Sequence, residues 1–222
     1  MSLIDYTYFI GEINVPNVSQ QTDVLSKLNH FIGKYEKDIL IKLLGYTLYK
    51  AFTSGLEDVS PAQKWLDIRD GKEYQITKDG KEYTVKWNGL INSDKQSLIA
   101  NYVYYHIILD ELTFNTGLGI ASPNQENADK SLAFNKMSSA FNGFVDLYGN
   151  KASNQYGSDA FISGYKYENR PFRYDNPDDY DFNTDLQPTA YNFIKHQNDL
   201  YGDDYYDKWI FTPIKPINSI GI

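Results

Sequence analysis

The stretch that decides the fold is TDVLSKLNHFIGKYEKDILIKLLGYTLYKAF, residues 22–52. Its apolar residues recur at the three-to-four-residue spacing of an amphipathic α-helix. Thr22 is a residue type that caps helix starts, and Gly33 and Gly45 are expected to divide the stretch into shorter helices. We therefore expect a mainly α protein built as a helical bundle.

The sequence predicts less regular structure before this stretch and more helices after it. Residues 4–18 mix β-branched and aromatic residues with Gly11 and Pro16, and are expected to form an extended N-terminal arm. The further helices are one from Pro61 to Gly71, one opened by the capping box Ser93–Gln96 and running through Leu112, one from about Asn124 to Tyr148 that Gly149 stops, and one from Thr189 to Leu200.

Residues 72–87 change from the helical period to a period of two. Tyr74 and Ile76 alternate with polar residues, and so do Tyr83, Val85 and Trp87, with an Asp-Gly pair between the two runs. Asp-Gly favours the tight turn of a β-hairpin. Because a lone hairpin is marginally stable, its Tyr83 and Trp87 are expected to pack either on the helices or on a neighbouring molecule.

The composition changes after residue 149. Residues 154–185 are rich in Tyr, Asp, Asn and Gly without any period, which is typical of a long irregular loop. Pro213 and Pro216 are expected to keep the C-terminal tail extended. We therefore divide the chain into a helical domain, residues 1–150, and an interaction extension, residues 151–222, with a loop, a short helix and the tail.

The tail carries too many apolar side chains for a free, solvated segment. Those expected at an interface are Trp209, Phe211, Ile214, Ile217, Ile220 and Ile222. The tail either lies back on its own subunit or docks on a neighbour, by strand addition or in a groove. In the second case, deletion of residues 211–222 should preserve the fold and abolish assembly, whereas loss of folding would show that the tail covers its own core.

The charge and the residue types argue against several kinds of site. The chain has 21 Lys and Arg against 29 Asp and Glu, a net charge of −8, and no cysteine. An acidic balance disfavours a protein that grips phosphate backbones. His30, His106 and His196 form no two-histidine metal motif, and the sequence holds no phosphate-binding loop or nucleophile elbow. We expect no catalysis, no cofactor and no metal site.

Two clusters of acidic residues were considered as functional sites, and the sequence supports neither strongly. Asp179 and Asp181 imitate the start of a calcium loop, but Thr184 stands where that loop needs glycine. A looser cation site stays open, with Asp178, Asp179, Asp181 and Asp185 as its carboxylates. Asp110 and Glu111 are neighbours on a helix and do not face each other, so a surface charge pair is expected.

The sequence shows neither a membrane segment nor an export signal. No run approaches the ~20 apolar residues of a membrane helix, and the first residues lack an export signal.

Four stretches carry a family resemblance. They are FIGEINVPN at residues 9–17, KYEKDILIKLLGYTLYKAF at 34–52, WNGL at 87–90 and INSIGI at 217–222. They resemble proteins of Bacteroidetes and their tailed phages, including crAss-like phages, and this group is similar to head-tail connector (adaptor) proteins. The likeness covers most of residues 1–148 and the tail.

The resemblance implies a structural virion protein made in the bacterial host cytoplasm and located at the head-tail junction. It implies a ring, twelve-fold by analogy, that joins the portal to a tail or second ring protein and lets DNA pass without specific binding. The acidic charge suits such a conduit, because a negative wall repels the duplex. The alternative is a carbohydrate- or ligand-binding module that stacks sugars on the loop tyrosines. Tyr165, Tyr167, Tyr174 and Tyr180 are the secondary interface candidates, and Tyr156 would join them in the alternative.

Overall fold

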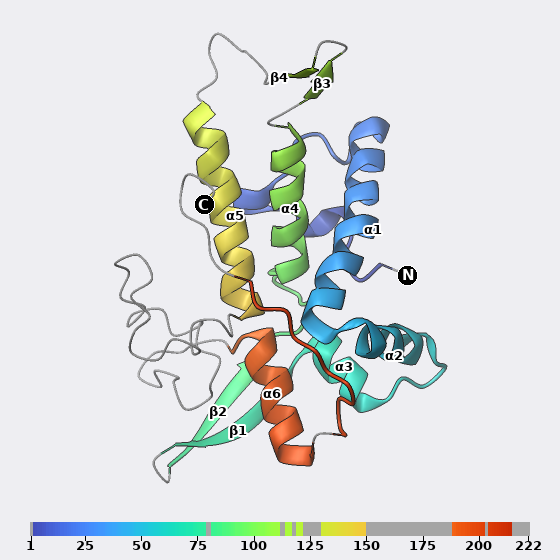
Figure 1. Cartoon of the computed structure of the whole chain (residues 1–222), viewed down its shortest axis with the longest axis vertical. Helices are drawn as coiled ribbons and strands as arrows, with labels where there is room; N and C mark the ends of the chain where they lie inside the picture. Colours follow the sequence, from blue (N-terminus) through green and yellow to red (C-terminus); the bar gives the residue numbers. More distant parts are fainter. Residues whose placement is uncertain are drawn as a thin grey trace. The chain divides into compact units, whose positions relative to one another are not determined.

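The computed structural model describes residues 2–78, 81–111, 114–116, 119–121, 130–149, 188–202 and 204–214. The predicted mainly α class with a β-hairpin is confirmed (Figure 1). The elements are η1 Tyr6–Tyr8, η2 Gly11–Ile13, α1 Thr22–Leu44, α2 Tyr46–Glu57, α3 Gln63–Asp70, β1 Lys72–Lys78, β2 Lys81–Trp87, α4 Leu98–Glu111, β3 Phe114–Thr116, β4 Gly119–Ala121, α5 Lys130–Tyr148 and α6 Ala190–Tyr201. The short β3–β4 pair has no counterpart in the sequence-based expectations.

The chain divides into two compact units. The first contains Met1–Ile39 and Asp94–Phe144, and the second contains Leu40–Ser93 and Val145–Lys215. These units do not coincide with the two regions that the sequence suggested, which meet at residue 150. The reason is that α6 and residues 204–214 pack with the hairpin, α3 and the C-terminal end of α1 instead of forming a separate extension.

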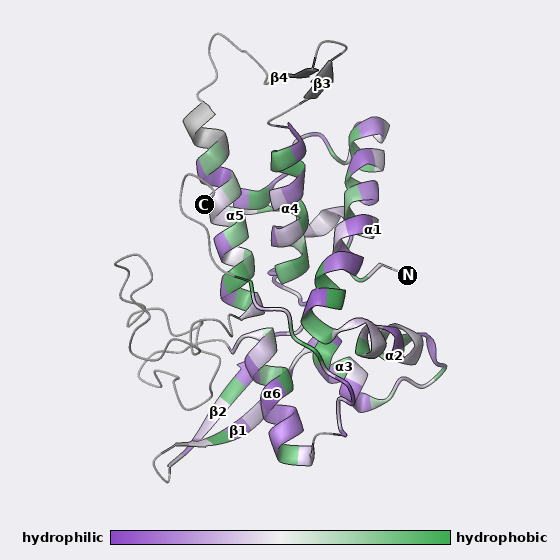
Figure 2. Cartoon of the chain, in the orientation of Figure 1, coloured by the Kyte–Doolittle hydropathy of each residue, from purple (hydrophilic) through white to green (hydrophobic). Residues whose placement is uncertain are grey.

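The first unit is built around α4. Hydrophobic residues, green in Figure 2, recur along this helix, and Ile99, Val103 and Ile107 are among its buried side chains. The Tyr102 hydroxyl donates a 2.7 Å hydrogen bond to the Asp38 carboxylate of α1. Buried apolar side chains therefore pack α4 into this unit, and the Tyr102–Asp38 bond is one of the polar contacts that join it to α1.

The N-terminal segment is held against α1 instead of projecting as an extended arm. It forms the two 3-10 turns η1 and η2. The carboxylate of Glu36, on α1 and only 7% exposed, accepts bonds from the Ser2 hydroxyl at 2.8 Å and from the backbone amides of Leu3 and Ile4 at 3.0 and 3.3 Å. Burial raises the pKa of Glu36 even though these donors act in the opposite direction.

Two predicted helix boundaries are wrong. Gly33 does not interrupt α1, which runs through it to Leu44. The Ser93–Gln96 capping box is not used, because Lys95 has a φ of +59°, which an α-helix does not allow. Helix α4 starts at Leu98 instead, and the Ser97 hydroxyl accepts the backbone amide of Ile99 at 3.2 Å.

The second unit is centred on the predicted hairpin, which is confirmed. Strands β1 and β2 pair antiparallel from Lys72↔Trp87 to Lys78↔Lys81. The buried residues alternate along both strands and lie on one face: Tyr74, Ile76, Val85 and Trp87. That face packs on α6, where the rings of Phe193 and Trp87 stack 5.9 Å apart. The Asp-Gly turn at 79–80 lies outside the described residues.

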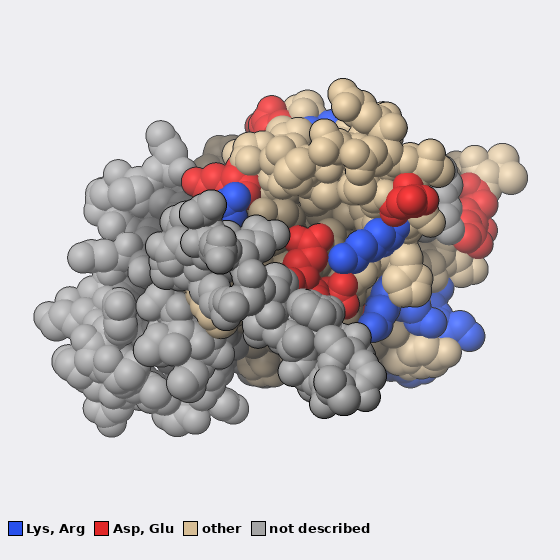
Figure 3. Space-filling view, turned by 90° about the horizontal axis from the view of Figure 1, so that it is seen from above, with Lys and Arg blue, Asp and Glu red and all other residues tan. Residues whose placement is uncertain are grey.

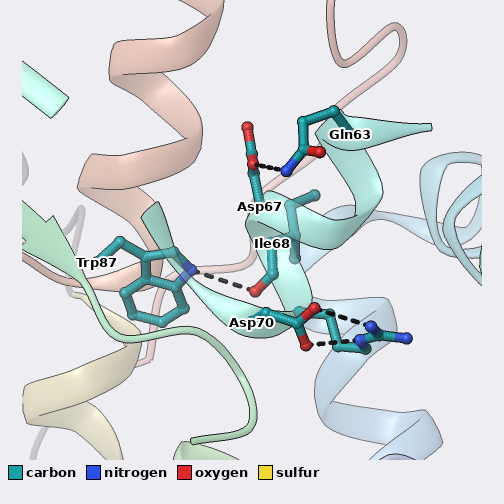
Figure 4. Close-up of polar contacts among 6 residues, drawn as sticks. Gln63, Asp67, Ile68, Asp70 and Trp87 are labelled. Carbon is teal, nitrogen blue, oxygen red and sulfur yellow. Dashed lines mark hydrogen bonds and ion pairs between the residues drawn. The ribbon is translucent and has the colours of Figure 1, made fainter. Parts of the chain in front are cut away.

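Polar bonds join α3 to the hairpin (Figure 4). The Trp87 indole donates to the Ile68 carbonyl at 3.2 Å. The buried Asp67 carboxylate accepts from the Gln63 side chain at 2.7 Å, as Figure 4 shows. It also accepts from Lys72 of β1 at 2.8 Å. Because each buried polar group of this set has a partner, α3 is tied firmly to the hairpin.

Candidate interaction surface

Residues 209–214, here called the strap, complete the C-terminal end of α1. The Trp209 indole donates to the Leu43 carbonyl at 2.8 Å. The backbone amides of Ile210 and Thr212 donate to the Leu44 and Lys42 carbonyls at 3.2 and 2.8 Å. The last carbonyls of a helix have no partner within the helix. The strap supplies those partners from a position 166 residues further along the chain.

Gly45 allows the strap to approach this closely. Its φ is +77°, and a Cβ added there would lie only 2.9 Å from the Cβ of Ile210. A side chain at residue 45 would therefore clash with the strap and strain the backbone. The sequence identified Gly45 as a helix end, and the structure adds that it seats the strap.

Aromatic contacts hold the other side of the strap. Phe211 packs on Tyr148 of α5 and Tyr191 of α6, with ring centroids 4.8 and 4.6 Å away, and Trp209 lies 5.2 Å from Tyr191. The Tyr148 hydroxyl donates to the Thr212 carbonyl at 2.8 Å. Of the two arrangements considered for the tail, residues 209–214 therefore adopt the one on their own subunit.

The predicted interface residues are placed very differently from one another. Trp209 and Phe211 lie together in the strap, and the half-buried Ile214 ends it. The expectation for Trp87 is corrected, because a side chain only 1% exposed and packed on Phe193 has no surface left for a partner. Tyr83 of the hairpin is half-buried. The remaining candidates lie outside the described residues: Ile217, Ile220, Ile222, Tyr165, Tyr167, Tyr174 and Tyr180.

Two large side chains are exposed where the strap meets α2. The sequence did not single out Tyr46, whereas Ile210 is one of the apolar tail residues that were expected to be covered. Tyr46, the first residue of α2, is 60% exposed, and Ile210 of the strap is 66% exposed. They flank the same backbone position, because Ile210 lies over Gly45. The Lys50 ammonium lies 5.9 Å from the centre of the Tyr46 ring. We call Tyr46 and Ile210 the exposed pair. The surplus of apolar residues in the tail indicated Ile210, whereas only its position next to a helix-ending glycine could have indicated Tyr46.

The described residues hold no group of three or more His, Asp or Glu side chains placed to bind a metal ion. His30 is exposed, His106 stacks 3.7 Å from the Tyr35 ring, and His196 packs 4.6 Å from Tyr74. Burial lowers the pKa of His196. The aromatic packing of His106 and His196 is that of structural residues. The acidic residues 178, 179, 181 and 185 lie outside the described part of the chain.

Charged residues of both signs lie close together. On the face drawn in Figure 3, described acidic and basic side chains form small groups among uncharged residues. Lys27 pairs with Asp110 at 3.1 Å and with Glu111 at 3.6 Å, so these two carboxylates form surface ion pairs.

Compared with protein-family models, curated protein sequences and solved structures, the chain matches none of them. Among the helices that the structure describes, none combines the length and the apolar character needed to cross a membrane.

Proposed function

We propose that this chain is a structural ring subunit of the head-tail junction of a tailed phage, that it joins the portal to the tail, and that it lines part of the DNA conduit. The family resemblance of residues 9–17, 34–52, 87–90 and 217–222 motivates this assignment. The partners are other copies of the chain in a ring, twelve-fold by analogy, the portal protein, and a tail or second ring protein. The protein belongs to the virion and has no catalytic role.

The observation that carries the proposal is that the tail has two parts, the strap and the apolar residues that follow it. Residues 209–214 are fastened to α1, α5 and α6 of their own subunit. Residues 215–222 follow directly and contain Ile217, Ile220 and Ile222. A rigid helical subunit from which a short apolar segment continues is the form expected of a subunit that assembles with others.

The charge fits the role of a conduit. The net charge of −8 repels duplex DNA, and basic side chains such as Lys27, Lys72 and Lys195 are paired with carboxylates. A surface of this kind lets DNA slide past without being held. The carbohydrate-binding alternative depends on tyrosines outside the described residues, and no described contact favours it.

The test is assembly with a portal protein encoded in the same genome. The two proteins are purified separately, mixed, and examined by light scattering after gel filtration and by electron microscopy. We expect rings of this chain stacked on the portal ring. A chain that stays monomeric and does not bind the portal at any tested concentration would refute the proposal, and a positive glycan-binding screen would favour the alternative.

A further inference from the structure

Two prolines, Pro213 and Pro216, lie near the end of the strap. Pro213 disfavours helical or tightly turned backbone at Thr212, and Pro216 does the same at Lys215. The strap fixes Thr212 to α1 at 2.8 Å. The eight residues 215–222 can reach at most about 29 Å from the strap.

The exposed pair, Tyr46 and Ile210, is a rigid apolar surface. The backbone of Ile210 is bonded to Leu44, and Tyr46 begins α2 immediately after Gly45. Both side chains are more than half exposed although the backbone beneath them is fixed. Exposed apolar side chains on a preformed surface cost little ordering when they bind a partner, which makes them suitable anchors.

We propose that residues 215–222 of one copy of this chain bind the exposed pair of a second copy. The occupant is argued from where the strap ends, the length of chain beyond it, and its three isoleucines. A contact between two different surfaces of identical subunits is heterologous, and such contacts repeat from copy to copy until a ring closes. This inference deepens the proposed function and rests on it.

The absence of cysteine from the chain permits a direct test by cross-linking. One protein carries Thr47→Cys, an exposed position next to Tyr46, and another carries Ser219→Cys, next to Ile220. The two are mixed, and disulfide-linked heterodimers are counted over time on a non-reducing gel. The matched control replaces Thr47→Cys by Ser60→Cys, which is also exposed and lies beyond the other end of α2.

We expect the Thr47 pair to form heterodimers about 100-fold faster than the Ser60 pair, because docking raises the local concentration of the two thiols. Adding Tyr46→Ser to the Thr47→Cys protein should remove this advantage. Equal rates for the Thr47 and Ser60 pairs would overturn the inference. So would a protein with both cysteines, Thr47→Cys and Ser219→Cys, that closes a disulfide within one copy in preference to one between copies.

The same samples separate failure of the inference from failure of the proposed function. If the unmodified chain forms portal-bound rings while the two cross-linking rates are equal, the ring function stands and the docking inference falls. If the unmodified chain stays monomeric and ignores the portal, the proposed function falls. A protein ending at Ile214 keeps the strap, so it should remain folded and lose ring formation.

Discussion

Two glycines at the same helix should respond in opposite ways to the same substitution. Gly45 has a φ of +77°, and an added Cβ would lie 2.9 Å from Ile210, whereas a Cβ at Gly33 would meet nothing within 4 Å. Gly33 lies within α1 in ordinary helical backbone. We expect Gly33→Ala to stabilise the protein by about 0.4–1 kcal/mol, because alanine narrows the unfolded ensemble.

The magnitude at Gly45 combines two effects. Alanine in backbone of this kind costs about 1–3 kcal/mol. Displacing the strap would weaken the Ile210–Leu44 hydrogen bond, which adds about 1 kcal/mol. Gly45→Ala should therefore destabilise the protein by about 2–4 kcal/mol. For a chain of this size each kcal/mol shifts the melting temperature by about 2–4 °C.

The assay is thermal and urea unfolding of both variants, followed by circular dichroism, with hydrogen exchange at the amides of Ile210 and Thr212. Gly45→Ala should lower the midpoint and speed exchange at both amides, while Gly33→Ala should raise the midpoint and leave exchange unchanged. In a protein ending at Lys208 the strap is absent, so Gly45→Ala should destabilise that protein less than it destabilises the full chain. The difference measures the part of the effect that comes from the strap. A Gly45→Ala protein within about 0.5 kcal/mol of the parent would refute this account of how the strap is seated.

Three further predictions concern the tail, the N-terminal segment and the loop. A protein ending at Lys208 should melt at a lower temperature than one ending at Ile214, because only the first loses the strap; this replaces the expectation that residues 211–222 can be removed without effect on the fold. Burial raises the pKa of Glu36, so its contribution to stability is fully present below its ordinary value of 4.5 and is lost as the pH rises through the folded-state pKa. The free energy of unfolding of the parent, measured with urea relative to that of Glu36→Gln, should therefore decrease from pH 4 to pH 7. A difference that stays constant over this range would contradict the prediction. Replacing residues 151–186 by a short Gly-Ser linker should preserve the melting temperature within a few degrees, because a Cβ on Gly149 would lie 2.7 Å from Tyr191 and the ends of the segment are already adjacent. A collapse of the circular dichroism signal in the linker variant would show that the segment is needed for folding.

The elements that the sequence predicted well are those with local causes. The period of two fixes the hairpin at 72–87, and Thr189 caps α6 by accepting the Asn192 amide at 3.1 Å. Each of these signals lies within a few residues of the structure that it specifies.

The position of the strap against α1 and Gly45 depends on contacts between residues far apart in the sequence, which no local pattern encodes. Two of its three bonds to α1 join backbone groups, which are the same for nearly every residue type. Gly33 and Gly45 look alike in the sequence and are separated only by the φ that the surroundings impose. Glu36 resembles an ordinary surface carboxylate between Tyr35 and Lys37, and only the packed N-terminal segment reveals its burial.

The late position of the strap in the sequence has a consequence for folding during translation. The strap follows every other element that the structure describes, whereas the α1 carbonyls that it satisfies are translated early. A chain emerging from the ribosome therefore carries an incomplete α1 terminus until about residue 212 is available. An unfinished or prematurely released chain lacks this closure, so it is less stable than a chain translated beyond the strap.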